Sequence, residues 1–367
     1  MRIAYMLTSL GIGGAERQVV ALAEGLKARG HAVALVVLEA ERREEWPTSV
    51  EVMRLETRKT PLGLLTGLAR ARRSMRGFQP DLIHSHTFPA NMAARLLRLI
   101  YPVPVLSTIH NVYEGSRARM AAYRLTDLLC CRTTAVSQAA ADRFVRLKAV
   151  PARKCVVLTN GIDTAEFAPS LERREWTRAQ MGAGGEFIWL AVGRIVPAKD
   201  YPNLLRAFVE VPAESNARLW IAGEAAGPEA AVVKTLADEL GLGDSVRWLG
   251  LRRDMAGLLD AADGFVLASA WEGMPLAVGE AMAMEKVVAA TDVGGVRELI
   301  GEAGRIVPAG SPESLALAML GLMRMSAEER SRLGHAARER VESQFSMEAK
   351  ADEWEALYRR VIASDRG

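Results

Sequence analysis

Short apolar runs alternate with segments of helical periodicity along the whole chain, and this alternation constrains the fold more than any other feature. The runs have the length of β-strands, and the segments between them have the length of helices. Strands that are separated by helices form βαβ units, in which the strands are parallel. The pattern therefore predicts an α/β fold with parallel sheets. The predicted strands lie at residues 3–7, 32–38, 50–55, 81–84, 103–109, 133–136 and 155–158, and again at 187–192, 217–221, 245–249, 264–267, 287–290 and 305–307.

The strands form two series, and a turn at Asn160-Gly161-Ile162-Asp163 lies between them. The polar stretch from this turn to residue 185 is typical of a linker that contains a helix. A chain of 367 residues also exceeds one ordinary core and suits two domains. We therefore predict two doubly wound, Rossmann-like domains that face each other across a cleft. Their expected boundaries are 1–165 and 166–349, and we expect a C-terminal helix at about 350–367 to pack back on the first domain.

The composition is that of a globular protein, with 50% hydrophobic and 25% charged residues. No apolar run reaches the roughly 18 residues that a membrane-spanning helix needs. A predicted strand begins directly after Met1, so we expect no signal peptide. The three cysteines, of which Cys130 and Cys131 are adjacent, have neither the spacing of a metal site nor that of a disulfide framework. We expect a cytoplasmic protein without a metal site.

The net charge of +3 conceals a difference between the two halves of the chain. Residues 1–165 contain 24 Lys and Arg against 13 Asp and Glu, whereas the remainder contains 23 against 31. A basic first half suggests an anionic partner, such as a membrane, a nucleic acid or a phosphorylated substrate. Cations spread over an ordinary solvated surface are the alternative.

Residues 269–283 read S-A-W-E-G-M-P-L-A-V-G-E-A-M-A and hold two carboxylates, Glu272 and Glu280. If a helix begins near Pro275, Glu272 lies on the loop before it and Glu280 about one and a half turns inside. The unpaired N–H groups at such a helix N-terminus favour a diphosphate, and the carboxylates could accept hydrogen bonds from sugar and ribose hydroxyls. These N–H groups belong to Met274, Leu276 and Ala277. The segment therefore indicates a nucleotide-sugar site, the alternative being two glutamates with no shared ligand.

This arrangement resembles the E-x7-E motif of the retaining glycosyltransferases of family 4, which have the GT-B fold. The resemblance implies that Glu272 contacts the transferred sugar and that Glu280 contacts the ribose of the donor. It also implies that the turn between the two glutamates binds the donor, through Gly273, Met274, Pro275 and Leu276.

The loop after the predicted strand at 187–192 supplies two cations, Arg194 and Lys199. A guanidinium fork and an ammonium point charge can stabilise the negative charge that grows on a diphosphate leaving group. The spacing R-x4-K matches the phosphate-binding pair of family 4. Asp200 stands where many relatives carry glycine, and we expect no consequence from this. The alternative is a pair of solvated cations beside a loop.

Three further segments of the second half resemble family motifs to different degrees. Leu251 and Arg252 end another predicted strand, where relatives grip the edge of the nucleotide base. Residues 292–298 resemble the family's glycine turn with its trailing glutamate. Residues 223–228 carry extra residues where relatives have a compact Gly-x-Gly-Pro, which leaves the shape of the base pocket open.

The first predicted strand is followed by a glycine-rich turn that contains Gly13, Gly14 and Glu16. Gly11-x-Gly13 partly mimics a dinucleotide fingerprint, but Glu16 occupies the third glycine position and would set a carboxylate beside the pyrophosphate. The same residues match the G-G-A-E turn of family 4. The resemblance implies that Gly13 and Gly14 approach the donor phosphate and the acceptor.

Histidines end two predicted strands of the first half. His110 follows the strand at 103–109, and the segment Thr108-Ile109-His110 resembles the family's active-site histidine, which lies beside the donor sugar. His84 and His86 end the other strand. A lone histidine is more often structural than functional, which is the alternative for each of them. The candidates on the acceptor side are Glu16, His86 and Asn111.

The ordered set of motifs implies a retaining, metal-independent hexosyltransferase that moves a sugar from a nucleoside-diphosphate donor to an acceptor hydroxyl. Its catalytic candidates are His110, Glu272, Arg194 and Lys199. The resemblance implies no cofactor other than the donor as co-substrate, a glycan or lipid-linked acceptor in polysaccharide or glycolipid assembly, and no nucleic-acid partner. Two alternatives stay open, a nucleotide-sugar 2-epimerase and a catalytically inactive nucleotide-sugar-binding subunit.

Residues 62–76 combine a leucine stripe with four arginines and are preceded by Arg58 and Lys59. A basic amphipathic helix of this kind can lie on an anionic membrane surface, which would make the protein peripheral on the inner membrane face. The alternative is that Leu64, Leu65 and Leu68 pack against the sheet while the arginines face water. The four arginines are Arg70, Arg72, Arg73 and Arg76.

Overall fold

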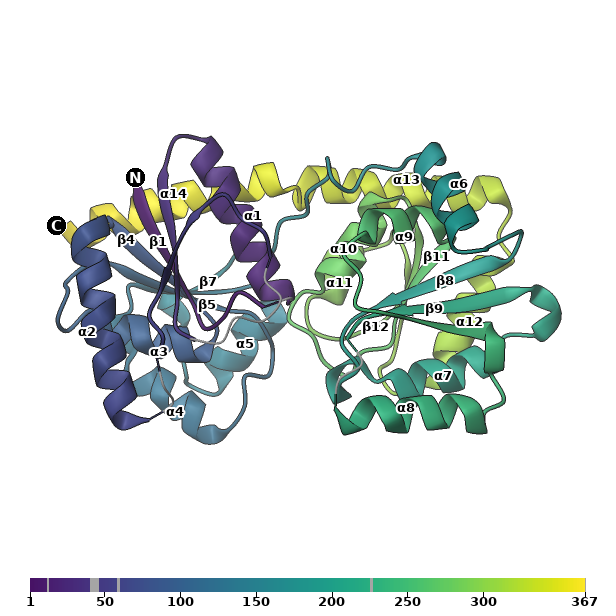
Figure 1. Ribbon diagram of the computed structural model, residues 1–367, viewed down its shortest axis with the longest axis horizontal. Coiled ribbons are helices and arrows are strands. Elements are labelled where there is room, and N and C mark those ends of the chain that lie inside the picture. The colour runs from purple at the N-terminus through teal and green to yellow at the C-terminus, as the bar shows by residue number, and fades with distance from the viewer. Residues whose placement is uncertain (12, 40–45, 58–59, 225–226, 367) are drawn as a thin grey trace. The chain divides into compact units, whose positions relative to one another are not determined.

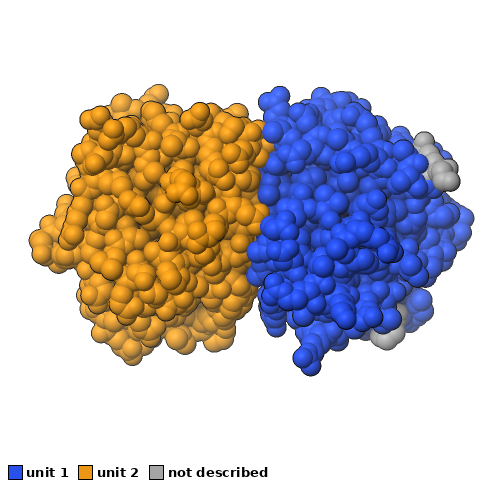
Figure 2. Space-filling model, turned by 180° about the vertical axis from the view of Figure 1, so that it is seen from behind, with its two compact units in different colours: residues 1–161, 347–367 blue, residues 162–346 orange. Residues whose placement is uncertain are grey.

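A computed structural model of the chain describes residues 1–11, 13–39, 46–57, 60–224 and 227–366. The chain forms two compact units (Figure 2). Unit 1 comprises Met1–Gly161 together with Met347–Gly367, and unit 2 comprises Ile162–Ser346. Each unit is built on a parallel sheet flanked by helices (Figure 1), so the predicted α/β class and the two Rossmann-like domains are confirmed.

The described part of unit 1 contains a seven-stranded parallel sheet in the order β3-β2-β1-β4-β5-β6-β7. Each strand begins within two residues of its predicted position, because the apolar runs are buried in the sheet. The strands are β1 (Arg2–Leu7), β2 (Ala32–Val37), β3 (Glu51–Arg54), β4 (Leu82–His86), β5 (Val105–Ile109), β6 (Arg132–Ala135) and β7 (Cys155–Val157).

Helices cover both faces of this sheet, because successive residues of each strand point to opposite sides. Ile3 and Tyr5 of β1 pack with residues of the first and last helices of the chain, whereas Ala4 and Met6 pack on the opposite side. The helices of unit 1 are α1 (Gly14–Ala28), α2 (Pro61–Phe78), α3 (Phe88–Leu97), α4 (Arg117–Leu125), α5 (Gln138–Arg146) and α14 (Met347–Arg366), with 3-10 turns η1 (Asp127–Leu129) and η2 (Ala152–Lys154).

The C-terminal helix α14 belongs to unit 1 although unit 2 separates it from the rest of that unit in sequence (Figure 1). Its residues Trp354 and Tyr358 are buried among side chains of β1 and α1. Arg29 at the end of α1 pairs with Asp352 and Glu355 of α14. Apolar packing and ion pairs therefore both attach the last helix to the first.

The described part of unit 2 contains a six-stranded parallel sheet in the order β10-β9-β8-β11-β12-β13. Its strands are β8 (Phe187–Val192), β9 (Ala217–Ala222), β10 (Val246–Gly250), β11 (Gly264–Leu267), β12 (Val287–Thr291) and β13 (Arg305–Val307). Its helices are α6 (Leu171–Gln180), α7 (Tyr201–Val209), α8 (Pro228–Glu239), α9 (Met255–Ala261), α10 (Leu276–Ala283), α11 (Val296–Ile300), α12 (Pro312–Met323) and α13 (Ala327–Gln344), with 3-10 turns η3 (Pro197–Lys199), η4 (Ala213–Ser215) and η5 (Gly243–Ser245).

The helix predicted within the polar stretch is present as α6 and is fixed to unit 2, since Arg173 pairs with Asp260 and Arg174 with Asp263. One expectation about a single element differs from the structure. His84 lies inside β4 and not at its end, because the strand continues to His86. Among the described residues, no helix is long and apolar enough to cross a lipid bilayer.

Candidate functional site

In unit 2, the loops that follow β8 and β11 meet at the carboxyl edge of the sheet, where ligands bind in open α/β folds. The N–H of Ala270 donates to the carbonyl of Ala198 over 2.9 Å, which joins the two loops. The N–H of Gly223, directly after β9, likewise donates to the carbonyl of Gly250 at the end of β10 over 2.8 Å. Motifs that are far apart in sequence are therefore brought to one edge.

Lys199 and Glu272 form an ion pair across these two loops, with 2.6 Å between Nζ and Oε1. The hydroxyl of Ser269 donates to the same carboxylate oxygen over 2.7 Å. The side chain of Glu272 is 12% exposed and that of Lys199 is 23% exposed, so both remain accessible at one end. The structure therefore brings together two predicted site residues that are 73 positions apart.

The loop that carries Glu272 packs against a glycine turn at Gly294 and Gly295, which holds it in place. Gly295 N–H donates to Gly273 O over 2.7 Å. Gly294 has a φ of 54°, and a Cβ at this position would lie 2.3 Å from the carbonyl oxygen of Glu272. Only glycine allows this approach. The turn at 292–298, which follows β12, therefore stabilises the loop that carries Glu272.

Helix α10 begins directly after this loop, with Pro275 as its N-cap. Glu272 lies on the loop and Glu280 lies inside the helix, which confirms the predicted position of the helix start. Glu280 is 5% exposed. The N-terminal N–H groups of α10 begin at Leu276, a half-buried residue two positions after the buried Met274. This end of the helix provides a place for an anion.

Arg194 is exposed, unlike the paired Lys199. Its loop follows β8, where Gly193 and Gly223 approach so closely that a Cβ on Gly223 would lie 1.9 Å from Gly193 O. The hydroxyl of Tyr201 donates to Gly193 O over 2.6 Å. The backbone under Arg194 is therefore tightly held, while its exposed guanidinium has no hydrogen bond or ion pair within the part of the chain that the structure describes.

On the predicted base side, Leu251 is 41% exposed. Arg252 forms a two-bond ion pair with Asp254, with 2.8 Å between Nε and Oδ1. Glu298 of α11 follows the glycine turn. The extra residues at 223–228 include Ala225 and Ala226, which lie outside the described residues. The pairing of Arg252 was not visible from the motif.

In unit 1, the carboxyl ends of β4 and β5 carry His86 and His110. His86 Nδ1 and His110 Nε2 are 2.8 Å apart, and His86 is 2% exposed whereas His110 is half-buried. His86 was expected to line the acceptor side, but it lies beneath His110 and is enclosed by Tyr5 and His84, whose rings lie 5.7 and 4.0 Å away. A ligand at this edge would therefore meet His110.

Burial sets the protonation state of this cluster. It lowers the pKa of His110 to about 4, and lowers the pKa of His86 well below its ordinary value. A carboxyl group also lies here, since Glu114 accepts a hydrogen bond from the N–H of His110 over 3.2 Å and one from the hydroxyl of Tyr123 over 2.7 Å. Burial raises the pKa of Glu114. Glu114 was missed in the sequence analysis, because its only signal is its place four residues after a strand-end histidine.

The glycine-rich turn lies at the end of β1, next to β4 in the sheet. Gly13 is the N-cap of α1, and a Cβ there would lie 2.4 Å from the carboxylate of Glu16. Gly14 is exposed, and the hydroxyl of Ser9 donates to Glu16 over 3.4 Å. Asn111, half-buried, accepts a hydrogen bond from the N–H of Tyr113. Ile12 of this turn lies outside the described residues.

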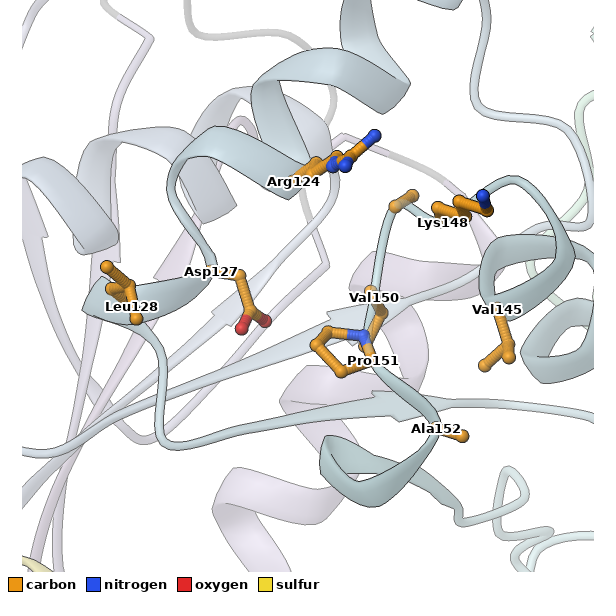
Figure 3. A pocket seen from close by; sticks show the side chains of 9 residues that line it. Arg124, Asp127, Leu128, Val145, Lys148, Val150, Pro151 and Ala152 are labelled. Atoms are coloured by element: carbon orange, nitrogen blue, oxygen red, sulfur yellow. The ribbon is translucent and has the colours of Figure 1, made fainter.

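A pocket of about 350 Å³ lies at the opposite edge of the sheet of unit 1, in front of the amino ends of β6 and β7 (Figure 3). In the view of Figure 3, Leu128 lies at the left of the pocket, Lys148 at the right, and Arg124 above and between them. Asp127 in its wall pairs with Lys154 over 3.0 Å. None of the predicted site residues lines this pocket. Within the described ranges, no group of three or more His, Cys, Asp or Glu side chains is arranged to hold a metal ion.

Helix α2 was expected either to lie on a membrane or to pack its leucines against the sheet, and the structure agrees with each expectation only in part. Leu68 packs against the core as the soluble alternative expects, but Leu62 and Leu65 are 71% and 65% exposed. Arg70 donates to Leu55 O over 3.0 Å. Arg72 is half-buried, whereas Arg73 and Arg76 are exposed. Arg58 and Lys59, which precede the helix, lie outside the described residues.

Two family models match the chain, one in each half. The model described as Glycosyltransferase Family 4 matches residues 12–166, and the model described as Glycosyl transferases group 1 matches residues 172–340.

Among similar proteins of known assignment is a D-inositol 3-phosphate glycosyltransferase of Mycobacterium marinum, which is 30% identical over 81% of this chain and 67% of its own length. The D-inositol 3-phosphate glycosyltransferase of Kineococcus radiotolerans is 29% identical over 97% of this chain and 93% of its own length.

Solved structures share the fold. The Anabaena protein Alr3699/HepE, solved in complex with UDP and glucose, has a TM-score of 0.86 at 21% identity, over 97% of this chain and 99% of its own. The sucrose-phosphate synthase of Thermosynechococcus elongatus has a TM-score of 0.86 at 23% identity, over 99% of this chain and 100% of its own. Both neighbours place the two units in the GT-B fold.

Proposed function

The chain belongs to glycosyltransferase family 4, and we propose that it transfers a sugar from a nucleoside-diphosphate donor to an acceptor hydroxyl with retention of the anomeric configuration. The observation that carries this proposal is the Lys199–Glu272 pair beside the N-terminus of α10. It combines a cation, a carboxylate and free backbone N–H groups, which together suit the diphosphate and the hydroxyls of one nucleotide sugar.

The residues of unit 2 have separate tasks in this proposal. Arg194 and Lys199 bind the diphosphate, whose charge grows as the glycosidic bond breaks. Glu272 accepts hydrogen bonds from the transferred sugar and Glu280 from the ribose. Leu251 and Arg252 lie beside the base. Two neighbouring structures of the Anabaena protein contain UDP, which supports a uridine nucleotide as the first donor to test.

Unit 1 supplies His110 beside the donor sugar and most of the acceptor site in this proposal, with Glu16 and Asn111 near the acceptor. A bond forms between the acceptor oxygen and the anomeric carbon on the face from which the phosphate leaves. The acceptor proton passes to the departing phosphate oxygen, so no carboxylate acts as a covalent nucleophile. No metal is assigned a role, because the cations and the helix N-terminus meet the diphosphate charge.

The direct test is incubation of the protein with labelled nucleoside-diphosphate sugars, with and without hydroxyl acceptors, followed by separation of the products. Acceptor-dependent formation of a glycoside with the donor's anomeric configuration would support the proposal. Epimerised donor would indicate the 2-epimerase alternative. Donor that binds in a thermal-shift assay but is never consumed with any acceptor would indicate an inactive binding subunit. A ligand at 100 times its Kd should stabilise the protein by roughly 2.7 kcal/mol in that assay.

We also propose that α2 holds unit 1 on an anionic membrane, which would place the acceptor in glycolipid or polysaccharide assembly. The exposed Leu62 and Leu65 support this, together with the exposed cations Arg73 and Arg76 on the same helix. Apolar side chains enter the interface, and each cation near the surface adds about 1 kcal/mol.

Replacing Leu62 and Leu65 by Gln, or Arg73 and Arg76 by Gln, should therefore reduce co-sedimentation with anionic liposomes at least several-fold. Binding of the unchanged protein should weaken as salt rises. The matched control replaces two other exposed leucines of unit 1, Leu125 and Leu128, which are 82% and 87% exposed. Equal losses in the control variant, or no binding at low salt, would contradict a role of α2.

A further inference from the structure

His86 is buried, with 2% of its surface exposed. Its ring contacts the ring of His84 at a tilt of 43° with 4.0 Å between centroids, and it lies 5.7 Å from the ring of Tyr5. His84 is itself fixed, because its Nδ1 is 2.7 Å from the hydroxyl of Tyr358 and its Nε2 is 2.6 Å from the hydroxyl of Thr108. The ring of His86 therefore has little freedom to turn.

The two ring nitrogens of His86 differ in their hydrogen bonding. Its Nδ1 lies 2.8 Å from Nε2 of His110, whereas its Nε2 is buried with no hydrogen-bond partner among the described residues. A neutral imidazole carries one donor and one acceptor nitrogen, so one ring must donate the shared proton. If His110 donated, His86 would carry its own N–H on the buried, unpartnered nitrogen. Buried N–H groups without an acceptor are rare in folded proteins.

In the alternative arrangement the buried Nε2 of His86 carries a lone pair and no proton, so no N–H group is left without an acceptor. His86 then donates through Nδ1–H, and His110 accepts through Nε2. The proton of His110 must in that case lie on Nδ1, which makes no hydrogen bond within the part of the chain that the structure describes. The half-buried His110 therefore presents an N–H donor to whatever binds at this edge of the sheet.

We propose that His86 is a positioning residue, which holds His110 in the Nδ1–H form and in a fixed orientation so that His110 donates a hydrogen bond to the bound substrate. The assignment of the substrate as a donor sugar rests on the proposed function. The tautomer itself rests only on the arrangement of the two rings, so it can be tested without any substrate.

The first experiment measures the tautomer by nitrogen-15 NMR of the histidine rings in the intact protein at neutral pH. The chain has five histidines, and the His110→Asn variant identifies the signals of His110. We expect a protonated Nδ1 and an unprotonated Nε2 for His110, and a mixture of tautomers in His86→Leu. An Nε2–H signal for His110 in the unchanged protein would overturn the proposal, whether or not transferase activity is found.

The second experiment measures turnover in variants of His86. His86→Leu removes the donor and should lower kcat about ten-fold with little change in KM, because one orienting hydrogen bond is lost. His86→Asn places an amide N–H close to the position of Nδ1 and should restore most of that loss. If Leu leaves kcat unchanged, or if Asn is as slow as Leu while both are folded, the positioning role is refuted.

The matched control is Tyr358→Phe, which removes a hydrogen bond from the same buried cluster but leaves His86 and His110 in place. We expect its melting temperature to fall and the His110 tautomer to stay as in the unchanged protein. A shift of the His110 signals in this control, equal to that in His86→Leu, would mean that general loosening of the cluster explains the effect, and would overturn the specific role of His86.

Discussion

At the scale of single residues, the two cations of unit 2 are in different states. Lys199 is already neutralised by Glu272, which also accepts from Ser269, whereas Arg194 is exposed beside them. An anion that enters this site must share Lys199 with the carboxylate but meets Arg194 directly. Arg194 should therefore contribute more than Lys199 to the capture of a diphosphate.

Replacing Arg194 by Ala should lower kcat/KM roughly ten- to a hundred-fold, because a hydrogen bond to a charged group contributes about 1.5–3 kcal/mol. Steady-state kinetics with the nucleotide sugar measures this. Arg332→Ala, an exposed arginine on α13, serves as the control. Turnover of folded Arg194→Ala equal to that of the control would remove Arg194 from the site.

The histidine cluster makes stability depend on pH. The pKa of His110 is about 4 in the folded protein, against about 6.5 in an unfolded chain. The unfolded chain thus takes up a proton in this window that the folded protein refuses, so the free energy of unfolding falls as the pH drops from 6.5 to 4. The lowered pKa of His110 should reduce the free energy of unfolding over this window by on the order of 3 kcal/mol. Burial of His84 and His86 acts in the same direction.

Urea unfolding between about pH 7.5 and about pH 4.5 measures this dependence. It should be weaker in His110→Asn, which has no ring to protonate, than in the unchanged protein. His335→Gln is the control, since the side chain of His335 is 66% exposed. An identical pH slope in all three proteins would contradict the lowered pKa of His110.

At the scale of elements, most of the architecture follows from local patterns, but strand ends do not. β4 was predicted to end at His84, because apolar runs stop at the first polar residue. It continues to His86, because hydrogen bonds to Thr108 and Tyr358 allow His84 to be buried. Tyr358 lies 274 positions from His84, and no local pattern could connect them.

The candidate site was predictable to a similar degree. The position of Glu272 before α10 and of Glu280 within it followed from the Gly-Met-Pro turn. The partners that hold the site were not predictable, because they depend on packing. Examples are the hydrogen bond of Ser269 to Glu272 and the carboxyl of Glu114 behind His110.

Asp200, which lies between η3 and α7, stands where many relatives carry glycine, and its conformation explains why aspartate is tolerated there. Asp200 has a φ of 44° and a ψ of 51°, in the left-handed region where glycine is favoured. Its side chain offsets the strain, because it caps α7 by accepting from the N–H of Asn203. Aspartate tolerates this backbone conformation better than most residues do. The substitution is therefore compatible with the loop that presents Lys199.

Asp200→Ala should lower the free energy of unfolding by about 2 kcal/mol, since it loses the cap and keeps the strained conformation. Asp200→Gly loses the same cap but has no strain, and should cost only a few tenths of a kcal/mol. Denaturant unfolding of both variants measures the difference. Equal destabilisation by Ala and Gly would show that the backbone conformation contributes nothing.

At the scale of the whole molecule, unit 1 is assembled from both ends of the chain. Trp354 of α14 is 4% exposed and lies 4.7 Å from the ring of His84. Helix α14 also supplies Tyr358, so two side chains of the last helix contact His84 of the histidine cluster.

Trp354→Ala should destabilise unit 1 by about 3–5 kcal/mol, because it leaves a large cavity in the core. Hydrogen exchange resolved along the chain should show lost protection in β1 and β4, while β8 and β9 keep theirs. Trp176→Ala, at a tryptophan that is 63% exposed, is the matched control. Uniform loss of protection in both units would contradict independent cores.

The position of α14 also determines the order in which the protein can be completed on the ribosome. Unit 2 is contiguous and has emerged in full once Ser346 has left the exit tunnel. The first residues of unit 1 are synthesised before unit 2, but the core of unit 1 is complete only when Tyr358 has been made. The hydroxyl of Tyr358 lies 2.9 Å from that of Tyr5 in the folded protein. A nascent chain that stops before α14 therefore leaves uncovered the apolar side chains of β1 and α1 against which Trp354 and Tyr358 pack, and exposed apolar surface of this kind favours aggregation.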